Sequence, residues 1–196
     1  MNKPHAFVFI GRSGCGKGTQ AELLKADLVV KSSLPVFYIE TGDMFRNFIE
    51  GDGHSQKLSK DLYTKDARQP DFLACFMWST FLVKDFDGKS HVVFDGTPRS
   101  PLEAELLDTA FTFYQFEKVH IIHLDVSRPW SEKHLLARGR SDDATLAKID
   151  TRLNWFDKDV IPAINYFKNS NHDFIVVNGE QSIEEVHTAI GSTLNY

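Results

Sequence analysis

The chain of 196 residues has the length of one domain, or of one core with small inserts, and can bury a core without disulfides or a structural metal. Hydrophobic residues make up 42% and charged residues 25%, a globular balance that excludes disordered and fibrous proteins. Lys and Arg number 22 against 27 Asp and Glu, and the net charge of −5 argues against a general nucleic-acid-binding protein.

The lengths of the apolar runs and the number of cysteines indicate the cellular compartment. No run approaches the ~20 residues that span a bilayer. Residues 1–6 lead into the first apolar segment without a signal-peptide pattern. Cys15 and Cys75 are too few for a disulfide framework and do not resemble a zinc set. We therefore expect a cytoplasmic protein with no membrane or nucleic-acid partner and no structural zinc.

Short apolar runs rich in β-branched and aromatic residues predict five buried strands, at residues 6–10, 36–39, 91–94, 119–124 and 174–177. Helical periodicity separates them, whereas residues 45–83 are long and helical in texture and residues 128–143 are short and basic. Strands alternating with helices predict a parallel sheet with helices on both faces. Ligands bind outside the carboxyl ends of the strands in such sheets.

A glycine-rich segment, Gly11-Arg-Ser-Gly-Cys-Gly-Lys-Gly-Thr-Gln20, follows the first predicted strand and opens a helix. Its glycines allow consecutive backbone N–H groups to point at phosphate oxygens, Lys17 adds a mobile cation, and the helix adds its positive end. A glycine-rich turn with a surface lysine is the alternative. The strand and the helix on either side favour a phosphate-binding loop.

Four segments together resemble the adenylate kinase family of nucleoside monophosphate kinases. In the common form of such a loop a Ser or Thr follows the lysine. Here Gly18 follows it, as in the family's GxxGxGKGTQ pattern. Residues 41–46 (Thr-Gly-Asp-Met-Phe-Arg) are similar to its TGDxxR segment, and residues 95–99 (Asp-Gly-Thr-Pro-Arg) to its DGFPR segment. Residues 138–143 (Arg-Gly-Arg-Ser-Asp-Asp) resemble its lid.

With the alternating elements, this resemblance implies an α/β fold of the P-loop NTPase type, with a parallel sheet of about five strands. It implies a core at residues 1–44, 84–127 and 144–196, a helical insert at 45–83 that binds the nucleoside monophosphate, and a short lid region at 128–143. The implied enzyme is a monomer that transfers the γ-phosphoryl group of ATP, with Mg²⁺, to AMP and gives two ADP.

The resemblance also implies the residues of each subsite. For ATP these are Gly14, Cys15, Gly16, Lys17, Gly18, Thr19, His134, Arg138 and Gln181. For AMP they are Thr41, Arg46, Arg68, Gln69, Gly96, Arg99, Glu103, Arg140 and Arg152. The catalytic residues are Lys17, Arg99, Arg138, Arg140 and Arg152. Asp95 would order the water around Mg²⁺.

Side-chain chemistry agrees with these assignments. Phosphoryl transfer is mostly positioning and charge neutralisation, and the planar fork of arginine binds phosphate oxygens in pairs. An arginine taken alone is more often a solvated surface charge. A carboxylate such as Asp95 at the end of an apolar strand needs a cation or metal, or else it caps the following turn.

Glu103 departs from the family, which usually has a Gln here that contacts the adenine of AMP. Ser100-Pro-Leu-Glu103 also forms a capping-box pattern. Both interpretations stay open. The first raises the alternative of a kinase for another monophosphate, GMP or CMP.

The remaining departures concern the loop and the lid. Thr97 replaces a bulky aromatic residue, and His134 stands where the family has an arginine stacked on the ATP base. Arg12 adds charge beside the phosphates, and only Gly139 separates the two lid arginines. Trp155 is interpreted as packing. A non-catalytic ATP-binding module is the last alternative, and cations on both sides of the γ-phosphate argue against it.

Overall fold

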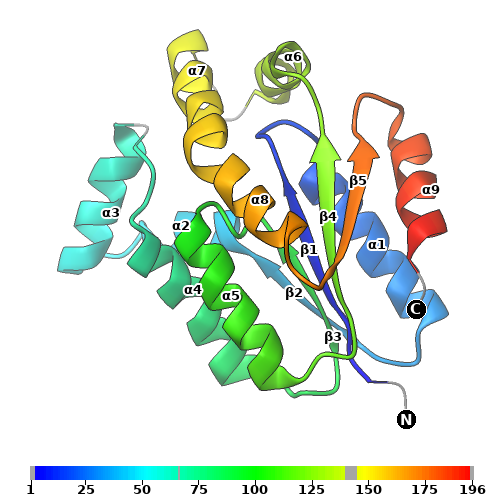
Figure 1. Cartoon of the computed structure of the whole chain (residues 1–196). Coiled ribbons are helices and arrows are strands. Elements are labelled where there is room, and N and C mark those ends of the chain that lie inside the picture. The colour runs from blue at the N-terminus through cyan, green and yellow to red at the C-terminus, as the bar shows by residue number, and fades with distance from the viewer. Residues whose placement is uncertain (1–2, 66, 140–144, 195–196) are drawn as a thin grey trace.

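The computed structural model describes residues 3–65, 67–139 and 145–194, and the statements below concern these ranges. Five parallel strands form one sheet in the order β2-β3-β1-β4-β5 (Figure 1). The strands are β1 (Ala6–Gly11), β2 (Val36–Glu40), β3 (His91–Asp95), β4 (Val119–Asp125) and β5 (Asp173–Asn178). All five predicted strands are present, with bounds that differ by at most one residue at either end. They were predicted to be buried, but the edge strands β2 and β5 each have a single buried residue, because only one neighbouring strand covers them.

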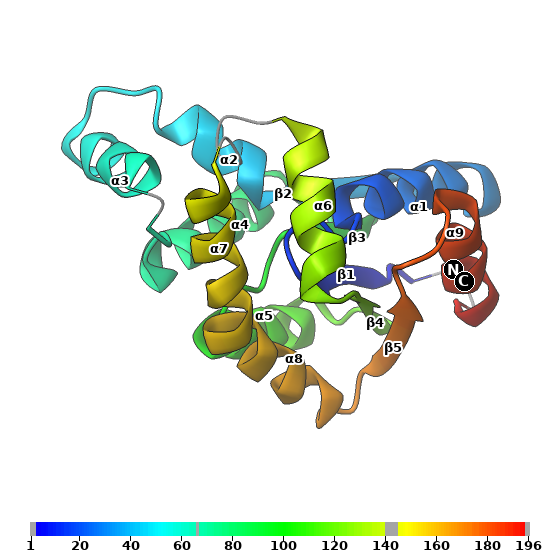
Figure 2. The same ribbon diagram turned by 90° about the horizontal axis from the view of Figure 1, so that it is seen from above.

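Helices cover both faces of the sheet, as predicted. Phe7 and Phe9 point to the layer of α1 (Lys17–Lys31) and α9 (Ile183–Thr193). Val8 and Ile10 point to the opposite layer, formed by α4 (Asp71–Asp85), α5 (Pro101–Tyr114) and α8 (Ile161–Lys168) (Figure 2). Every residue of β1 is buried. The continuous apolar run in the sequence therefore reflects a strand covered on both faces.

The remaining helices lie towards the carboxyl ends of the strands. Between β2 and β3 the chain forms α2 (Thr41–Phe48), α3 (His54–Thr64) and α4, and α3 stands at the margin of the molecule in both views (Figures 1 and 2). After β4 come α6 (Arg128–Arg138), α7 (Leu146–Trp155) and the short π-helix η2 (Phe156–Val160). Figure 1 places α6 and α7 beyond the arrowheads of β4 and β5.

Strand register brings the functional segments together. Phe9 of β1 pairs with Asp95 of β3, and Asp95 also pairs with Glu40 of β2. The glycine-rich loop after β1, α2 after β2 and the segment after β3 therefore begin at one edge of the sheet. In the described ranges, no helix combines the length and the apolar character that crossing a bilayer requires.

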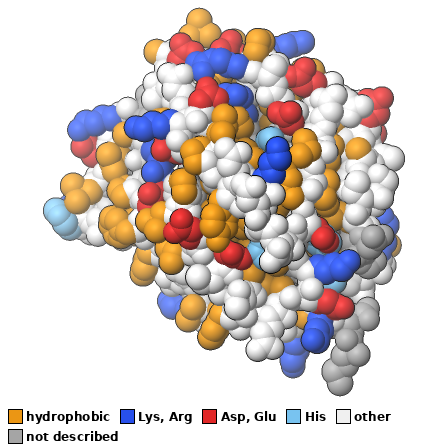
Figure 3. Space-filling model, viewed as in Figure 1, with side chains coloured by type: hydrophobic (Ala, Val, Ile, Leu, Met, Phe, Trp, Pro, Cys, Tyr) orange, Lys and Arg blue, Asp and Glu red, His pale blue; other side chains and the backbone are white. Residues whose placement is uncertain are grey.

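The outward faces of α4 and α5 carry apolar side chains. Phe72, Val83 and Phe113 are each more than 70% exposed, and hydrophobic side chains gather over this face of the molecule in Figure 3. Because α4 has apolar side chains on its outer as well as its inner face, the sequence of residues 45–83 shows a helical texture without a distinct amphipathic stripe.

Candidate active site

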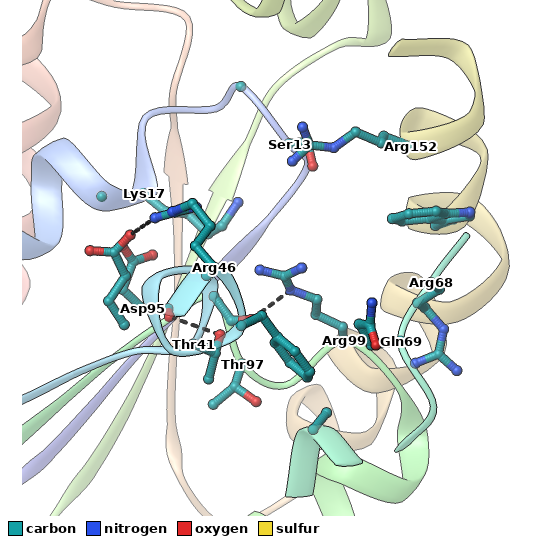
Figure 4. A pocket seen from close by; sticks show the side chains of 18 of the residues that line it. Ser13, Lys17, Thr41, Arg46, Arg68, Gln69, Asp95, Thr97, Arg99 and Arg152 are labelled. Carbon is teal, nitrogen blue, oxygen red and sulfur yellow. Dashed lines mark hydrogen bonds and ion pairs between the residues drawn. The ribbon is translucent and has the colours of Figure 1, made fainter. Parts of the chain in front are cut away.

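A cavity of about 800 Å³ opens at the carboxyl edge of the sheet. Its wall is formed by the glycine-rich loop, α2, the segment after β3, and the facing sides of α6 and α7. Arg99 and Arg152 extend into it from different elements (Figure 4). Cationic side chains from separate parts of the sequence therefore face one space.

The loop after β1 has the geometry of an anion site. Gly14 and Gly16 have positive φ angles of 83° and 91°, which a residue with a side chain rarely adopts. A Cβ on Gly14 would also lie 2.9 Å from the carbonyl oxygen of Ser131 on α6. Lys17, the first residue of α1, donates from Nζ to the carbonyl oxygens of Gly11 at 2.9 Å and Arg12 at 3.0 Å. The positive end of α1 and this lysine both face the cavity.

On the β2 side, Thr41 and Arg46 come from α2. Thr41 is buried and donates from Oγ1 to the carbonyl oxygen of Asp95 at 3.3 Å. Arg46 donates from Nη2 to Glu40 Oε1 at 2.9 Å and from Nε to Asp43 Oδ1 at 3.0 Å. Burial works against the charge of this guanidinium, but Asp43 and Glu40 outweigh it and raise the pKa of Arg46. An anion that enters here meets a cation already held by carboxylates.

Arg99 follows β3 and lines the same space. Its Nε donates to the carbonyl oxygen of Gly96 at 2.7 Å, which fixes the stem of the guanidinium. Burial lowers the pKa of Arg99, yet an arginine stays charged at neutral pH. The remaining N–H groups are of the kind that binds phosphate oxygens in pairs.

Asp95 ends β3 beside the start of α1. Tyr38 of β2 donates from its hydroxyl to Asp95 Oδ2 at 3.2 Å, and a Cβ on Gly18 would lie 3.1 Å from the same oxygen. Burial and the carboxylate of Asp95 raise the pKa of Tyr38, so the phenol stays a donor. A side chain at position 18 would crowd this carboxylate.

Glu103, the third residue of α5, is buried to 98% and faces the cavity. Its Oε2 accepts from Thr97 Oγ1 at 2.7 Å and from the backbone N–H of Arg99 at 2.8 Å. Burial raises the pKa of Glu103 despite these donors. Ser100 caps α5 by accepting from the N–H of Glu103 at 3.2 Å. Only half of the predicted capping box forms, because the glutamate carboxylate bonds to Arg99 rather than to the N–H of Ser100.

These features meet in one arrangement: a glycine-rich loop at the start of α1, the TGDxxR segment in α2 directly after β2, and Arg99 after β3. A model of the adenylate kinase family matches residues 9–172. The chain belongs to the adenylate kinase family. It is similar to proteins named adenylate kinase from Flavobacterium psychrophilum (31% identity over 192 residues, 96% of this chain and 97% of the relative) and Corynebacterium aurimucosum (31% over 182 residues, 92% and 94%). It is also similar to adenylate kinase 1 of Nostoc sp. (29% over 187 residues, 95% and 97%).

Most residues assigned from the adenylate kinase resemblance line this one cavity. The lining includes Gly14, Gly16, Lys17, Gly18, Thr19, Thr41, Arg46, Arg68, Gln69, Asp95, Gly96, Arg99, Glu103, His134, Arg138 and Arg152. Their convergence from distant segments is consistent with the predicted subsites, whose roles stay predictions.

Two assigned residues do not line the cavity, and a third is not described. The side chain of Cys15 is buried in the core beneath the loop and does not line the cavity, so only its backbone is in a position to serve a ligand. Gln181 is exposed after β5 and is not among the lining residues. Arg140 lies outside the described residues.

Two side chains assigned to the predicted monophosphate subsite are held by other residues of the chain. Arg68 donates from Nη1 to Asp71 Oδ1 at 2.6 Å and lies 3.4 Å from Asp159 of η2. The amide of Gln69 both donates to and accepts from Ser59 of α3. Both contacts fasten the segment between α3 and α4.

Two sequence interpretations need correction. Arg12 does not add charge to the cavity wall, because its guanidinium turns away and lies over the ring of Phe156. Trp155 was interpreted as packing, but it lines the cavity. Its position, three residues after Arg152 on the same helical face, is the signal that locates it. His134 stacks on Trp130 with ring centroids 4.4 Å apart and contacts its carbonyl oxygen through Nδ1 at 2.8 Å.

Glu40 and Tyr38 were not predicted as site residues. Glu40 ends β2 as Asp95 ends β3, so the rule about strand ends that selected Asp95 applies to it equally. Tyr38 lies inside a strand whose residues are mostly half-buried, and it gave no such signal. Among the described residues, no group of three or more His, Cys, Asp or Glu side chains is arranged to hold a metal ion.

Proposed function

We propose that this chain is an adenylate kinase, which transfers the γ-phosphoryl group of ATP to AMP and gives two ADP. The observation that carries the proposal is the convergence of cations from both halves of the chain on one cavity. Lys17 and the positive end of α1 lie on one wall, Arg46 and Arg99 on another, and Arg138 and Arg152 come from α6 and α7. A site that only binds ATP needs no cations for a second phosphate group.

In the proposed mechanism the chain positions two phosphates and neutralises their charge. The loop N–H groups and Lys17 hold the ATP phosphates. Thr41, Arg46 and Arg99 hold the acceptor phosphate. Arg138, Arg140 and Arg152 stabilise the transferring group. No strong general base is required, because the acceptor phosphate is itself the nucleophile.

The family uses ATP with Mg²⁺, and Asp95 is the residue that fits it. The carboxylate faces the cavity beside Gly18, and Tyr38 already satisfies one of its oxygens. Since Gly18 offers no hydroxyl ligand, Asp95 would hold the ion through water. When bound, Mg²⁺ would neutralise charge on the ATP phosphates.

Closure of residues 45–83 and 128–143 over the cavity would exclude water from the transfer. Most of the residues assigned to both subsites line a single cavity of this chain, and we propose that it acts as a monomer. Both cysteines are free thiols, in keeping with a reducing, cytoplasmic location.

A coupled assay of ADP formation from ATP with AMP, GMP, CMP or UMP tests the proposal. We expect transfer, fastest with AMP, and none in a Lys17→Met control. Tight ATP binding without transfer to any of the four would favour the binding-module alternative. The carboxylate of Glu103 in the cavity favours a GMP or CMP kinase as the second candidate, and a preference for either would show it.

A further inference from the structure

Arg12 belongs to the phosphate loop by sequence, but its side chain is used elsewhere. Nη2 donates to Asp157 Oδ1 at 3.0 Å, and the guanidinium carbon lies 4.1 Å from the centroid of the Phe156 ring. Only 12% of the side chain is exposed. The two loop residues that follow it, Ser13 and Gly14, line the cavity wall that Arg12 avoids.

Stability is a poor explanation for this contact. Nε and Nη1 of Arg12 are buried and have no hydrogen-bond partner among the described residues. A buried charge with unmade hydrogen bonds loses much of what its ion pair and its stacking on an aromatic ring contribute. A well-packed apolar residue at this position would serve the fold as well. The contact therefore indicates a role in fixing the position of the loop rather than in stabilising the fold.

The two residues that Arg12 contacts begin η2, directly after α7. A single π-turn inside a helix often marks a functional site. Arg152 lies four residues before Phe156, one helical turn away on the same face. Figure 4 shows Arg152 extending from α7 towards Ser13, the neighbour of Arg12. Arg12 thus holds the base of α7 against the loop that Arg152 reaches.

A second arginine extends this connection to α6. Asp157 Oδ2 lies 4.0 Å from Nη1 of Arg128, the first residue of α6. Arg128 donates to Asp150 Oδ1 at 2.7 Å and to Asn154 Oδ1 at 3.0 Å, both on α7. Asp157 therefore lies between an arginine of the loop and an arginine that ties α6 to α7.

We propose that Arg12 is a positioning residue for phosphoryl transfer, which locks the phosphate loop to η2 and so sets Arg152 relative to Lys17. This inference rests on the proposed function. In the nucleotide-free chain the carbonyl of Arg12 accepts from Lys17 while its side chain holds Asp157. One residue thus links the cation that begins α1 to the helix that carries Arg152.

Three variants separate positioning from direct phosphate binding. Asp157→Asn weakens the pair but leaves the charge of Arg12, and Arg12→Lys keeps a charge but loses the planar fork and much of the stacking. Arg12→Ala removes both the charge and the stacking. We expect each to lower kcat by about tenfold to a hundredfold, the scale of a misplaced catalytic group, with KM for ATP and AMP changed less than about twofold. Lys31→Ala, which breaks an exposed ion pair with Asp27 at the far end of α1, is the control.

Hydrogen exchange supplies a readout that does not depend on activity. In nucleotide-free Asp157→Asn, backbone amides of residues 146–160 should exchange faster, with the exchange of β1 unchanged. Normal kcat in Arg12→Lys together with a raised KM for ATP in Arg12→Ala would overturn the proposal in favour of direct phosphate contact. A lowered melting temperature with normal kcat, or unchanged exchange, would also overturn it. If the wild-type chain transfers no phosphate, the proposed function fails, while the exchange result still decides whether Arg12 fixes α7.

Discussion

Arg46 and Glu40 form an ion pair at 2.9 Å across the start of α2, inside the cavity proposed for the acceptor phosphate. The carboxylate occupies a donor that an incoming phosphate would use. Burial, a hydrogen bond to Asp43 and the negative charges of Asp43 and Asp95 raise the pKa of Glu40. Glu40 thus competes with an incoming phosphate for Arg46, although the surroundings of Glu40 disfavour its negative charge.

Replacing Glu40 with Gln should tighten binding of the acceptor. The amide keeps the shape and removes the charge that pairs with Arg46, so KM for AMP should fall by about threefold to tenfold, the scale of one ordinary hydrogen bond. Steady-state kinetics with AMP varied would measure it, with Glu105→Gln on the exposed side of α5 as the control. An unchanged or raised KM would mean that Glu40 orients Arg46 rather than competes for it.

Lys17→Met should remove activity and leave the fold intact. The ammonium group contacts charge that shifts during transfer, and such contacts contribute ~3 kcal/mol or more, on the order of a hundredfold or greater in rate. Turnover and thermal melting of the purified variant would be compared with wild type. Near-normal turnover with unchanged melting would show that the glycine-rich loop does not hold the ATP phosphates.

Binding of both nucleotides should protect residues 45–83 and 128–139. An analogue that joins two adenosines through phosphates spans both subsites and should close α2–α4 and α6 over the cavity. Hydrogen exchange with and without the analogue would report it, and ATP alone is the comparison. Protection confined to the loop after β1 would favour a simple ATP-binding module.

The sequence predicted the sheet well because its signals are local. Five apolar runs and the glycine-rich loop each depend on neighbouring residues, and strand ends locate Asp95 and Thr41 without tertiary information. What it could not predict are contacts between distant segments. Arg12 and Asp157 lie 145 residues apart, and nothing near Arg12 shows that its guanidinium turns away from the phosphates. The half-formed capping box at Glu103 likewise depends on how the segment after β3 turns.

Three buried histidines lie at the amino ends of β1, β3 and β4, far from the cavity. His5 donates its backbone N–H to His91 Nδ1 at 3.0 Å, and its Nδ1 lies 3.2 Å from His120 Nε2. Burial lowers the pKa of His91 and of His120 to about 4, and it lowers the pKa of His5, against the opposing charge of Glu117. All three are therefore neutral in the folded chain at neutral pH.

Acid should destabilise the fold through this cluster. Below pH ~6.5 the unfolded chain protonates these histidines, whereas the folded chain protonates His91 and His120 only near pH 4. The unfolded state binds more protons in that window, so the free energy of unfolding falls as pH falls, by on the order of 2 kcal/mol at pH 5 for each of His91 and His120. Urea unfolding at pH 7.5, 6 and 5 would measure this. His120→Phe should flatten the dependence and the exposed His54→Gln should not; equal stability at pH 7.5 and 5 would contradict it.

The last prediction concerns Glu103 and the acceptor base. Adenine offers N6–H₂ as donor and N1 as acceptor, and a Gln amide answers both, whereas an ionised carboxylate only accepts. Oε2 of Glu103 already accepts from Thr97 and Arg99, so we expect the base to meet the other oxygen. Guanine presents N1–H and N2–H₂, two donors suited to a carboxylate. Selectivity for AMP over GMP should therefore be weak at neutral and higher pH.

Glu103→Gln should sharpen the preference for AMP by ~1–2 kcal/mol, the scale of one buried hydrogen bond. Because burial raises the pKa of Glu103, lowering the pH adds a proton that adenine N1 can accept. The kcat/KM ratio of AMP to GMP should then rise as pH falls in the wild type and stay level in Glu103→Gln. Assays with AMP, GMP, CMP and UMP at neutral and at acidic pH would compare the two proteins.

If Glu103 serves only the start of α5, the variant gives a different result. Gln can accept from the N–H of Arg99 as the carboxylate does, and Ser100 still caps the helix. Both proteins would then show the same order of acceptors at every pH. That outcome would remove Glu103 from base recognition and leave the transfer activity, which depends on Lys17 and the arginines, untouched. A Thr97→Val variant separates the cases further, because it removes one of the two donors to Oε2 without changing the charge and should alter selectivity only if Glu103 meets the base.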